Sequence, residues 1–216
     1  MSELSATYVR LAESESSSVQ SQSTHATTGE LALEQEKAMV LRLLDGDTAA
    51  FDELYQRYVP SLFRFIYYSL NGDRNDAEDV LQETMLAAIR SLSRFRNESS
   101  LSTWLHVIAR NKISDQIRLR QRFRNHQVEE EAADLELQRV SMLPEDVIAQ
   151  RSDIEAVLRA LPQDQRDVLL GKYLDGFSVR ELSSIMGRSE KAVESLLTRA
   201  REAFRTCLAS LTSEGS

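Results

Sequence analysis

The chain has 216 residues, of which 42% are hydrophobic, and this is enough to build the core of one ordinary domain or of two small ones. Its three prolines and seven glycines are few for this length, so the composition excludes a chain that is disordered throughout and favours an all-α fold. The net charge of -8 would argue against a nucleic-acid partner if it were spread evenly, because phosphate binding depends on Lys and Arg.

The first predicted helices follow a polar tail. Residues 1–30 are rich in Ser, Thr, Gln and Glu, which predicts a disordered tail. A helix is expected over residues 31–44, and Thr48 is expected to cap the next helix, whose pattern Pro60 interrupts. The side chains expected on the buried side of that second helix are Phe51, Leu54, Tyr55 and Tyr58. A further helix then continues to a turn at Asn71-Gly72-Asp73.

The clearest apolar stripe of the chain lies between Asp76 and Phe95 and predicts an amphipathic helix. Its members are Ala77, Val80, Leu81, Met85, Ala88, Ile89 and Leu92. Asp79 and Glu83 fall off this stripe, toward the opposite face of the helix.

The middle of the chain contains a basic block followed by an acidic block. A polar loop over residues 96–100 precedes a long helix expected over residues 101–124. Residues 90–124 carry nine basic and two acidic side chains, 9 minus 2 or +7, which predicts a nucleic-acid-binding face. Residues 125–159 carry three basic and nine acidic side chains, 3 minus 9 or -6, and residues 125–145 among them predict a flexible acidic linker.

Capping and turn residues divide the C-terminal part into helices. In chain order they are Pro162 at the start of a helix, Asp175-Gly176 at its end, the capping box of Ser178 and Glu181, the turn at Gly187 and the cap Ser189. The sequence therefore predicts an all-α protein of two small helical domains, residues 31–124 and 146–211, followed by a short tail over residues 212–216.

A capped short helix, a glycine turn and a longer helix form the outline of a helix-turn-helix, whose second helix enters the major groove of DNA. An ordinary hairpin in an α-helical bundle has the same pattern. The residues that a recognition helix would place near bases or phosphates are Arg188, Ser189, Glu190, Lys191, Glu194, Ser195, Arg199 and Arg201.

The chain resembles the extracytoplasmic-function sigma factors of the sigma-70 family over nearly all of residues 31–211. The resembling segments, in the right order and spacing, are GDTAAFDELYQRY (46–58), DAEDVLQETMLAAIRSLSRF (76–95), STWLHVIARNKISDQIR (102–118) and the segment 161–205. The resemblance implies a subunit that directs bacterial core RNA polymerase to promoter DNA and helps to melt it. It also implies no catalysis, no cofactor, no metal and a monomer when free.

In this family the helix that matches residues 76–95 docks on the largest polymerase subunit. The resemblance therefore implies that the polymerase contact includes Asp76, Asp79, Gln82 and Glu83. An exposed carboxylate cluster can steer association with basic helices, although without the resemblance an ordinary solvated face is the better interpretation.

The resemblance assigns the minus-ten element to the loop and helix that begin after Phe95. The expected pocket loop is Arg96, Asn97, Glu98, Ser99 and Ser100, and the expected recognition helix carries Asn111, Lys112, Asp115 and Arg118. Opening a duplex costs a few kcal/mol per unstacked base, which a pocket for the base and basic contacts to the freed strand offset. Trp104 either stacks on DNA or belongs to the core with its apolar neighbours.

Two features of the resemblance stay open. The acidic linker either imitates nucleic acid in the polymerase channels or is a solvated tether, and it makes an anti-sigma protein wedged between the domains feasible. The last helix also departs from the family pattern, since Glu190 and Glu194 lie near the expected base contacts and Leu196 stands where Arg is frequent. Carboxylates accept hydrogen bonds from cytosine, so the departure is expected to alter the sequence that is read at minus thirty-five.

Two other classes of function, a regulator without polymerase and an enzyme, are alternatives to a sigma factor. A helix-turn-helix regulator that acts without polymerase would normally dimerise and would not need the face of residues 76–95. An enzyme finds little support, because His25, His106 and His126 are scattered and no glycine-rich phosphate loop or metal-ligand spacing occurs. No apolar run approaches the roughly 20 residues that span a bilayer and the single cysteine, Cys207, fits a reducing compartment, so a cytoplasmic protein without membrane insertion is expected.

Overall fold

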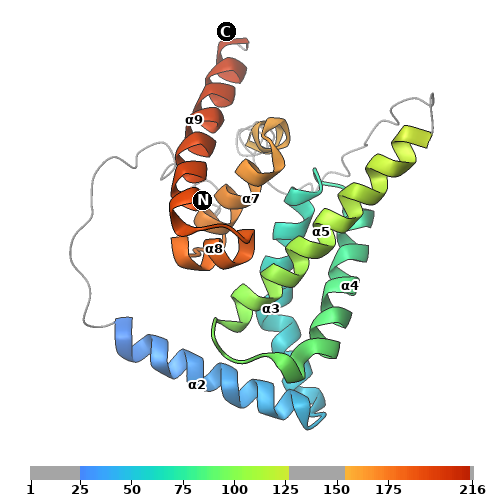
Figure 1. Cartoon of the computed structure of the whole chain (residues 1–216), viewed down its shortest axis with the longest axis vertical. Helices are drawn as coiled ribbons and strands as arrows, with labels where there is room; N and C mark the ends of the chain where they lie inside the picture. The colour runs from blue at the N-terminus through green and yellow to red at the C-terminus, as the bar shows by residue number, and fades with distance from the viewer. Residues whose placement is uncertain (1–24, 127–153, 215–216) are drawn as a thin grey trace, which may run out of the picture.

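The computed structural model describes residues 25–126 and 154–214, and the elements within them are helical (Figure 1). The first part comprises α2 (His25–Leu44), α3 (Thr48–Ser69), α4 (Arg74–Ser91), the 3-10 turn η1 (Leu92–Arg94) and α5 (Leu101–His126). The second part comprises helical residues 154–160, α7 (Gln163–Tyr173), α8 (Val179–Met186) and α9 (Glu190–Glu214). The predicted all-α class is confirmed.

The outer bounds of several helices differ from the predicted ones. Helix α2 begins at His25, six residues before the predicted start at residue 31, and α5 runs two residues past its predicted end at Arg124. Helix α9 extends to Glu214, into the predicted tail. Most of the predicted N-terminal tail and of the linker, residues 1–24 and 127–145, lies outside the described residues.

Asp47, rather than the predicted Thr48, caps helix α3. The Asp47 carboxylate accepts hydrogen bonds from the backbone N–H groups of Ala49 and Ala50, at 2.9 and 3.4 Å. Gly46, with φ at +81°, turns the chain so that Asp47 stands in an extended conformation directly before the first helical turn. Thr48 is already the first helical residue, so it cannot serve as the cap.

Pro60 lies inside α3, which is one continuous helix of 22 residues and not two. Proline removes one backbone hydrogen bond and normally interrupts a helix. Here its ring is exposed, while Val59 and Leu62 on either side of it are buried in the core. Burial of these neighbours therefore holds the helix together across the missing bond.

The exposed and buried faces of α3 and α4 differ in part from the predicted ones. Leu54 and Tyr58 are buried as expected, whereas Phe51 and Tyr55 are 38% and 50% exposed. On α4, Ile89 was also expected in the buried stripe but is 51% exposed. The helical period places these residues at the edges of the apolar stripe, where only the position of the neighbouring helices decides burial.

The C-terminal part folds as its capping signals predict. Both halves of the capping box are present. The Glu181 backbone N–H donates to the Ser178 hydroxyl, and the Ser178 backbone N–H donates to the Glu181 carboxylate. Gly187 ends α8 with φ at +62°, and the Ala192 N–H donates to the Ser189 hydroxyl at the start of α9. Helix α9 then buries Val193, Leu196, Leu197, Ala200 and Phe204. The predicted helix-turn-helix outline is confirmed.

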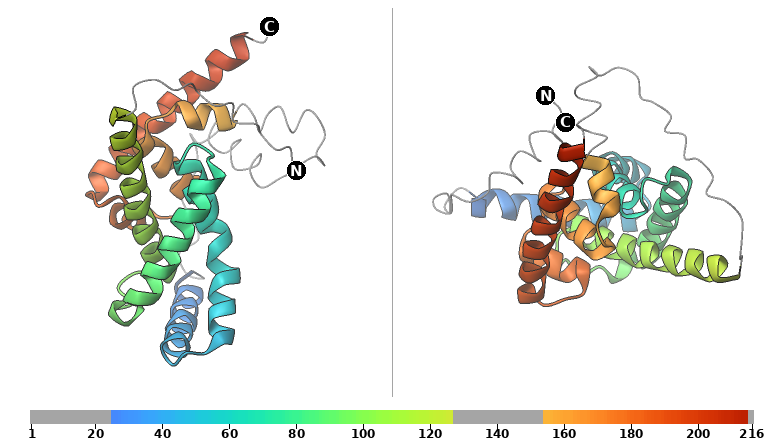
Figure 2. Two further views of the ribbon diagram at one scale, coloured as in Figure 1. Left: turned by 90° about the vertical axis from the view of Figure 1, so that its right-hand side faces the viewer. Right: turned by 90° about the horizontal axis from the view of Figure 1, so that it is seen from above.

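The two parts pack directly against each other. Helix α7 lies on α3 and α8 lies on α5, an arrangement that the three views in Figures 1 and 2 share. Their buried side chains form one continuous hydrophobic cluster. At its centre the imidazole of His106 contacts the rings of Phe65 and Phe177, with centroids 5.1 and 4.8 Å apart.

Candidate polymerase and nucleic-acid interface

The predicted polymerase contact forms the outward face of α4, but its four members differ in exposure. Asp79 and Gln82 are exposed and make no ion pair among the described residues. The Asp76 carboxylate is 18% exposed and is paired with Arg120 of α5. Glu83 is 62% exposed and accepts a hydrogen bond from Lys112 of α5 at 3.0 Å. Asp79 and Gln82 are therefore the members of this set that are free to meet a partner.

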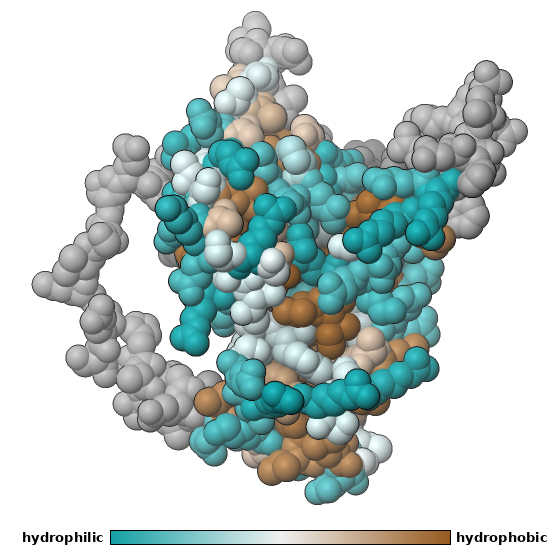
Figure 3. Space-filling model, viewed as in Figure 1, coloured by the Kyte–Doolittle hydropathy of each residue, from teal (hydrophilic) through white to brown (hydrophobic). Residues whose placement is uncertain are grey.

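Two exposed apolar side chains extend the same face toward the end of α4. Leu86 and Ile89 are 46% and 51% exposed. Leu86 lies four residues after Gln82 and Ile89 lies three residues after Leu86, so the three share one face of the helix. On the face drawn in Figure 3, hydrophilic and hydrophobic residues are intermixed, and one hydrophobic area lies at the lower end, where α2 meets α3. An acidic face that continues into apolar side chains suits a basic helical partner with an apolar edge.

The predicted pocket loop, residues 96–100, connects η1 with α5. Arg96 and Glu98 are exposed, and Asn97 has a φ of +56°. Ser99 is half-buried. Ser100 caps α5, because its hydroxyl accepts a hydrogen bond from the Thr103 N–H at 3.1 Å. The loop thus presents Arg96 and Glu98 to solvent, while its last residue is fixed to the helix.

The predicted recognition residues follow the loop along α5. Asn111 is exposed, and Arg118, at 68% exposure, donates to the Asp115 carboxylate at 3.3 Å. Lys112 is engaged with Glu83 of α4. The rise of about 1.5 Å per residue separates residue 101 from residue 111 by roughly 15 Å. Asn111, Asp115 and Arg118 are exposed and share one face of α5 by their helical spacing, at this distance along the chain from the loop.

Trp104 packs at the edge of the core. Its ring lies 5.1 Å from that of Phe95 between centroids, and it is half-buried against the hydrophobic cluster. Of the two interpretations left open by the sequence, this contact favours the core.

The predicted minus-thirty-five contacts gather at the turn before α9 and along its exposed face. The exposed members are Arg188, Ser189, Glu190, Lys191, Glu194, Ser195 and Arg199, and Arg201 is half-buried. Leu196, which departs from the family pattern, is only 3% exposed. Its side chain belongs to the hydrophobic core, so it cannot reach DNA.

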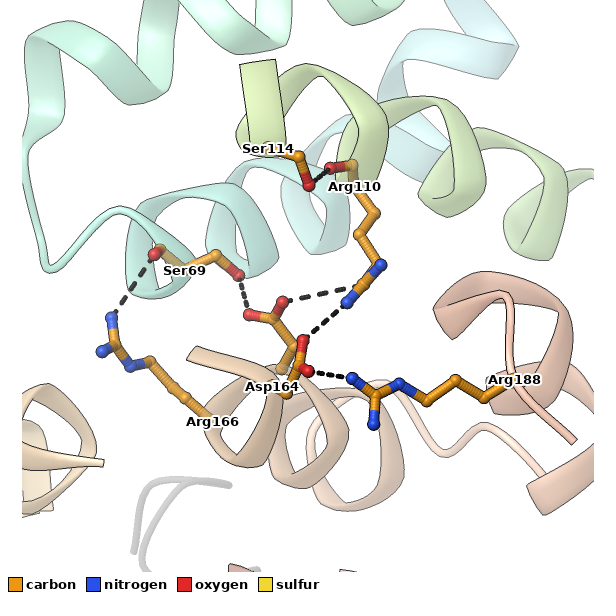
Figure 4. Close-up of polar contacts among 7 residues, drawn as sticks. Ser69, Arg110, Ser114, Asp164, Arg166 and Arg188 are labelled. Atoms are coloured by element: carbon orange, nitrogen blue, oxygen red, sulfur yellow. Dashed lines mark hydrogen bonds and ion pairs between the residues drawn. The ribbon is translucent and has the colours of Figure 1, made fainter. Parts of the chain in front are cut away.

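A carboxylate of α7 connects the two elements that are predicted to contact DNA (Figure 4). The Asp164 carboxylate accepts a hydrogen bond from Arg110 of α5 at 2.7 Å and also one from Arg188, a predicted phosphate contact. Asp164 and Arg188 are 38% and 39% exposed, so the ion pair between them is weak. Arg188 would have to leave Asp164 to meet a phosphate.

The deepest polar contacts between the two parts surround Arg166 and Asp167 of α7. The Arg166 guanidinium donates to the backbone carbonyl groups of Tyr68 and Ser69 at 3.0 and 3.3 Å, and also to Leu161 at 2.9 Å. The Asp167 carboxylate accepts the Ser69 hydroxyl at 2.7 Å. Burial raises the pKa of Asp167 to about 6. The carbonyl groups at the end of α3 thus accept hydrogen bonds from Arg166, a residue of the other part of the chain.

A second buried polar group lies beneath the turn that follows α7. The Asp175 carboxylate accepts a hydrogen bond from Arg64 of α3 at 3.1 Å and lies 3.8 Å from the Nε2 atom of His106. Burial raises the pKa of Asp175 to about 6, while burial lowers the pKa of His106 to about 4. His106 is therefore neutral at pH 7, and its contact with Asp175 is not an ion pair under these conditions.

No signal in the sequence distinguishes the residues that join the two parts. Asp164, Arg166 and Asp167 begin an amphipathic helix and have the charge pattern of an ordinary solvated turn. Glu36 was also missed, although its carboxylate accepts the Leu101 backbone N–H at the start of α5. Only the partners across the interface, far away in the sequence, distinguish these residues from surface charges.

Within residues 25–126 and 154–214, no group of His, Cys, Asp and Glu side chains could hold a metal ion. In the same residues, no helix is long and apolar enough to cross a membrane.

Comparison with known proteins finds a matching family for each part of the chain. The family model for Sigma-70 region 2 matches residues 54–123, and the model for Sigma-70, region 4 matches residues 151–204. The ECF RNA polymerase sigma factor BldN of Streptomyces coelicolor is 35% identical over 167 residues, which are 75% of this chain and 61% of BldN. The RNA polymerase sigma-H factor of Pseudomonas aeruginosa is 31% identical over 195 residues, 85% of this chain and 99% of that protein.

A similar arrangement of helices occurs in a solved structure. The sigma factor RpoE from Bartonella quintana, in complex with the anti-sigma factor NepR, superimposes with a TM-score of 0.61 and 27% sequence identity. The match covers 74% of this chain and 96% of that one, so it includes helices from both parts.

Proposed function

Because the chain belongs to the extracytoplasmic-function sigma factors of the sigma-70 family, the RNA polymerase subunits of transcription initiation, we propose that it directs core polymerase to specific promoters and helps to melt them. The observation that carries this proposal is the presence of region 2 and region 4 in one chain. A regulator that acts without polymerase has no use for region 2, so this alternative is wrong. The chain supplies recognition and leaves the chemistry of RNA synthesis to the core enzyme.

The two regions divide the work between them in this proposal. The outward face of α4, above all Asp79 and Gln82, docks on a basic helical surface of core polymerase. Residues 96–100 and the exposed side of α5 receive the opened minus-ten strand. The start of α9 reads the minus-thirty-five box in the major groove, with Lys191 near base edges and Arg199 near phosphates. Exposure of these side chains supports the assignment.

Reading both boxes requires the two parts to separate. Boxes 25 base pairs apart lie roughly 85 Å apart on straight DNA at 3.4 Å per pair. In the structure α8 lies on α5, and Arg188 is held by the same Asp164 that binds Arg110. The 27 residues from 127 to 153 between the helices can reach roughly 90 Å when fully extended. We therefore propose that the described arrangement is the one before promoter binding.

An anti-sigma protein is the partner that fits the packed arrangement. The structure of RpoE with the anti-sigma factor NepR matches helices from both parts of this chain. A protein that binds both parts in this arrangement would keep them together and so prevent promoter binding. Free of such a partner and of polymerase, the chain is proposed to be a cytoplasmic monomer, which analytical ultracentrifugation would test.

Run-off transcription with cognate core polymerase on fragments of host DNA tests the function. The wild-type chain is expected to give transcripts that core polymerase alone does not give. Asp79→Ala is expected to reduce them about tenfold at limiting sigma concentration, because one exposed charge at a docking face affects association. Asp79 is preferable to Asp76, whose pairing with Arg120 would mix docking with folding.

Asp52→Ala is the matched control, because Asp52 is an exposed carboxylate of α3 that, like Asp79, makes no ion pair among the described residues. It is expected to leave the transcripts unchanged. Absence of any chain-dependent transcript with cognate core would contradict the proposed function, whereas equal transcription by the Asp79 variant would contradict only the docking face.

A further inference from the structure

Glu36 lies on α2, outside the residues that match either sigma region, yet it reaches the start of α5. It is 7% exposed. Its Oε2 atom accepts the backbone N–H of Leu101 at 2.9 Å, and its Oε1 atom accepts the hydroxyl of Tyr58 at 2.9 Å. Both oxygens of this buried carboxylate are thus hydrogen-bonded, which offsets the cost of burying the charge.

Leu101 is the residue at which the predicted minus-ten loop ends and α5 begins. Its side chain is fully buried, and its N–H is one of the helix-terminal donors that need a partner. The negative charge of Glu36 at this end also suits the helix dipole. Ser100, the last loop residue, holds the next turn through Thr103. Glu36 therefore fixes the point where the loop leaves the helix.

The loop itself contains features that require such support. Asn97 is held at a φ of +56°, a conformation that residues other than glycine seldom adopt. Its side-chain Oδ1 atom is buried and accepts no hydrogen bond within the described part of the chain. Asparagine adopts this conformation more readily than most other residues, so the unpartnered buried Oδ1 atom, rather than backbone strain, makes the shape of the loop depend on its surroundings. The neighbouring Arg96 and Glu98 remain exposed and available to a ligand.

We propose that Glu36 is a positioning residue for minus-ten recognition, because it holds the Leu101 amide and so keeps residues 96–100 shaped to receive an unstacked base. The inference rests on the proposed function. Glu36 touches no DNA in this account and acts only through the loop. Tyr58, whose pKa is raised by burial, keeps its proton and holds the other carboxylate oxygen in place.

The test compares the affinity of holoenzyme for an intact minus-ten strand with its affinity for a strand that lacks one base. Full-length chain and cognate core are bound to labelled single strands that carry the minus-ten box of a promoter found by run-off transcription. One abasic site is placed at each position in turn. At the position of the captured base, the wild type is expected to lose about tenfold or more in affinity. In Glu36→Ala this ratio of abasic to intact Kd is expected to fall to about twofold.

The ratio separates positioning from mere stability. A variant that only folds less well has fewer active molecules, and this changes binding to both strands equally. Glu34→Ala, on the exposed side of the same helix, is the matched control and is expected to keep the wild-type ratio. Glu36→Gln is expected to keep it within about twofold, since the amide oxygen can accept the Leu101 N–H while the amide N–H donates to the Tyr58 hydroxyl.

A wild-type ratio in Glu36→Ala, or a loss in Glu36→Gln equal to that in Glu36→Ala, would overturn the inference. If Glu36→Ala does not fold, Tyr58→Phe decides instead. This variant removes only the hydroxyl and is expected to lower the ratio of abasic to intact Kd about threefold. An unchanged ratio would overturn the inference. A wild type that shows no abasic effect and supports no transcription would refute the proposed function instead.

Discussion

The hydroxyl of Ser69, at the end of α3, donates a hydrogen bond of 2.7 Å to the carboxylate of Asp167 on α7, 98 residues away in the sequence. Both residues are almost fully buried, at 2% and 1% exposure. The two parts of the chain therefore meet through a specific polar contact as well as through apolar packing. Separation of the parts exposes this carboxylate to water and leaves the hydroxyl without its partner.

Ser69→Ala is expected to weaken this interface by about 1–2 kcal/mol, because it leaves a buried carboxylate without a donor. The measurement is energy transfer between a dye on Cys207, the chain's single cysteine, and a second dye on a cysteine introduced at the exposed residue Arg94. The variant should show a larger fraction of separated molecules.

Ser91→Ala is the control for the Ser69 variant, since the Ser91 hydroxyl donates within its own helix to the Ala87 carbonyl. Equal energy transfer in Ser69→Ala and in the wild type would contradict the role of the interdomain hydrogen bond.

The buried Asp175 predicts a dependence of stability on pH. Its folded pKa of about 6 lies above its ordinary value of 3.8, so protonation favours the folded state. The resulting stability is complete below pH 4 and is lost as the pH rises through 6. His106, with its pKa lowered to about 4, acts in the opposite direction, since it loses stability as the pH falls from 6.5 to 4.

Asp175→Asn isolates the carboxyl from the other groups that titrate. Its oxygen can still accept from Arg64, while its amide can donate to the unpartnered Nε2 atom of His106. Relative to the variant, the wild type is expected to gain on the order of 2 kcal/mol between pH 7 and pH 4. Urea unfolding of both proteins at the two pH values measures this difference. A difference that does not change with pH would show that Asp175 titrates normally.

Pro60→Ala is expected to stabilise the chain by about 1–2 kcal/mol. Alanine restores an N–H donor in the middle of α3 and removes the proline ring from the helix, at an exposed position where no packing is lost. Thermal unfolding measures the gain. Pro162→Ala is the control, because Pro162 precedes α7 as its N-terminal cap and interrupts no helix; it should give no such gain. A destabilised Pro60→Ala would mean that the ring contributes to the fold.

Glu194→Gln is expected to change which base is preferred at one position of the minus-thirty-five box. Glu194 is exposed, and a carboxylate can accept a hydrogen bond from the amino group of cytosine, whereas an amide can also pair with adenine. Selection of promoters by holoenzyme from a randomised box should show a change of about tenfold at that position alone. Glu202→Gln, exposed further along α9, is the control. The same base preference in both variants would remove Glu194 from the DNA contact.

Local chemistry allowed several elements to be predicted from the sequence. The capping box of Ser178 and Glu181, the turn at Gly187 and the start of α5 at Leu101 depend on residues within one helical turn of each other. The resemblance of whole segments likewise identified both regions. These signals lie within single helices, so no tertiary contact was needed to interpret them.

Sequence by itself thus determined the helices, the helix-turn-helix and the family, because these follow from neighbours along the chain. Tertiary structure alone decided that Pro60 stays within one helix, that Leu196 is buried, and that Glu36 supports the predicted loop. It alone also joined Ser69 to Asp167. A charged residue on an amphipathic helix has the same local pattern whether it faces water or a partner, and only the packing of distant segments determines which of the two it meets.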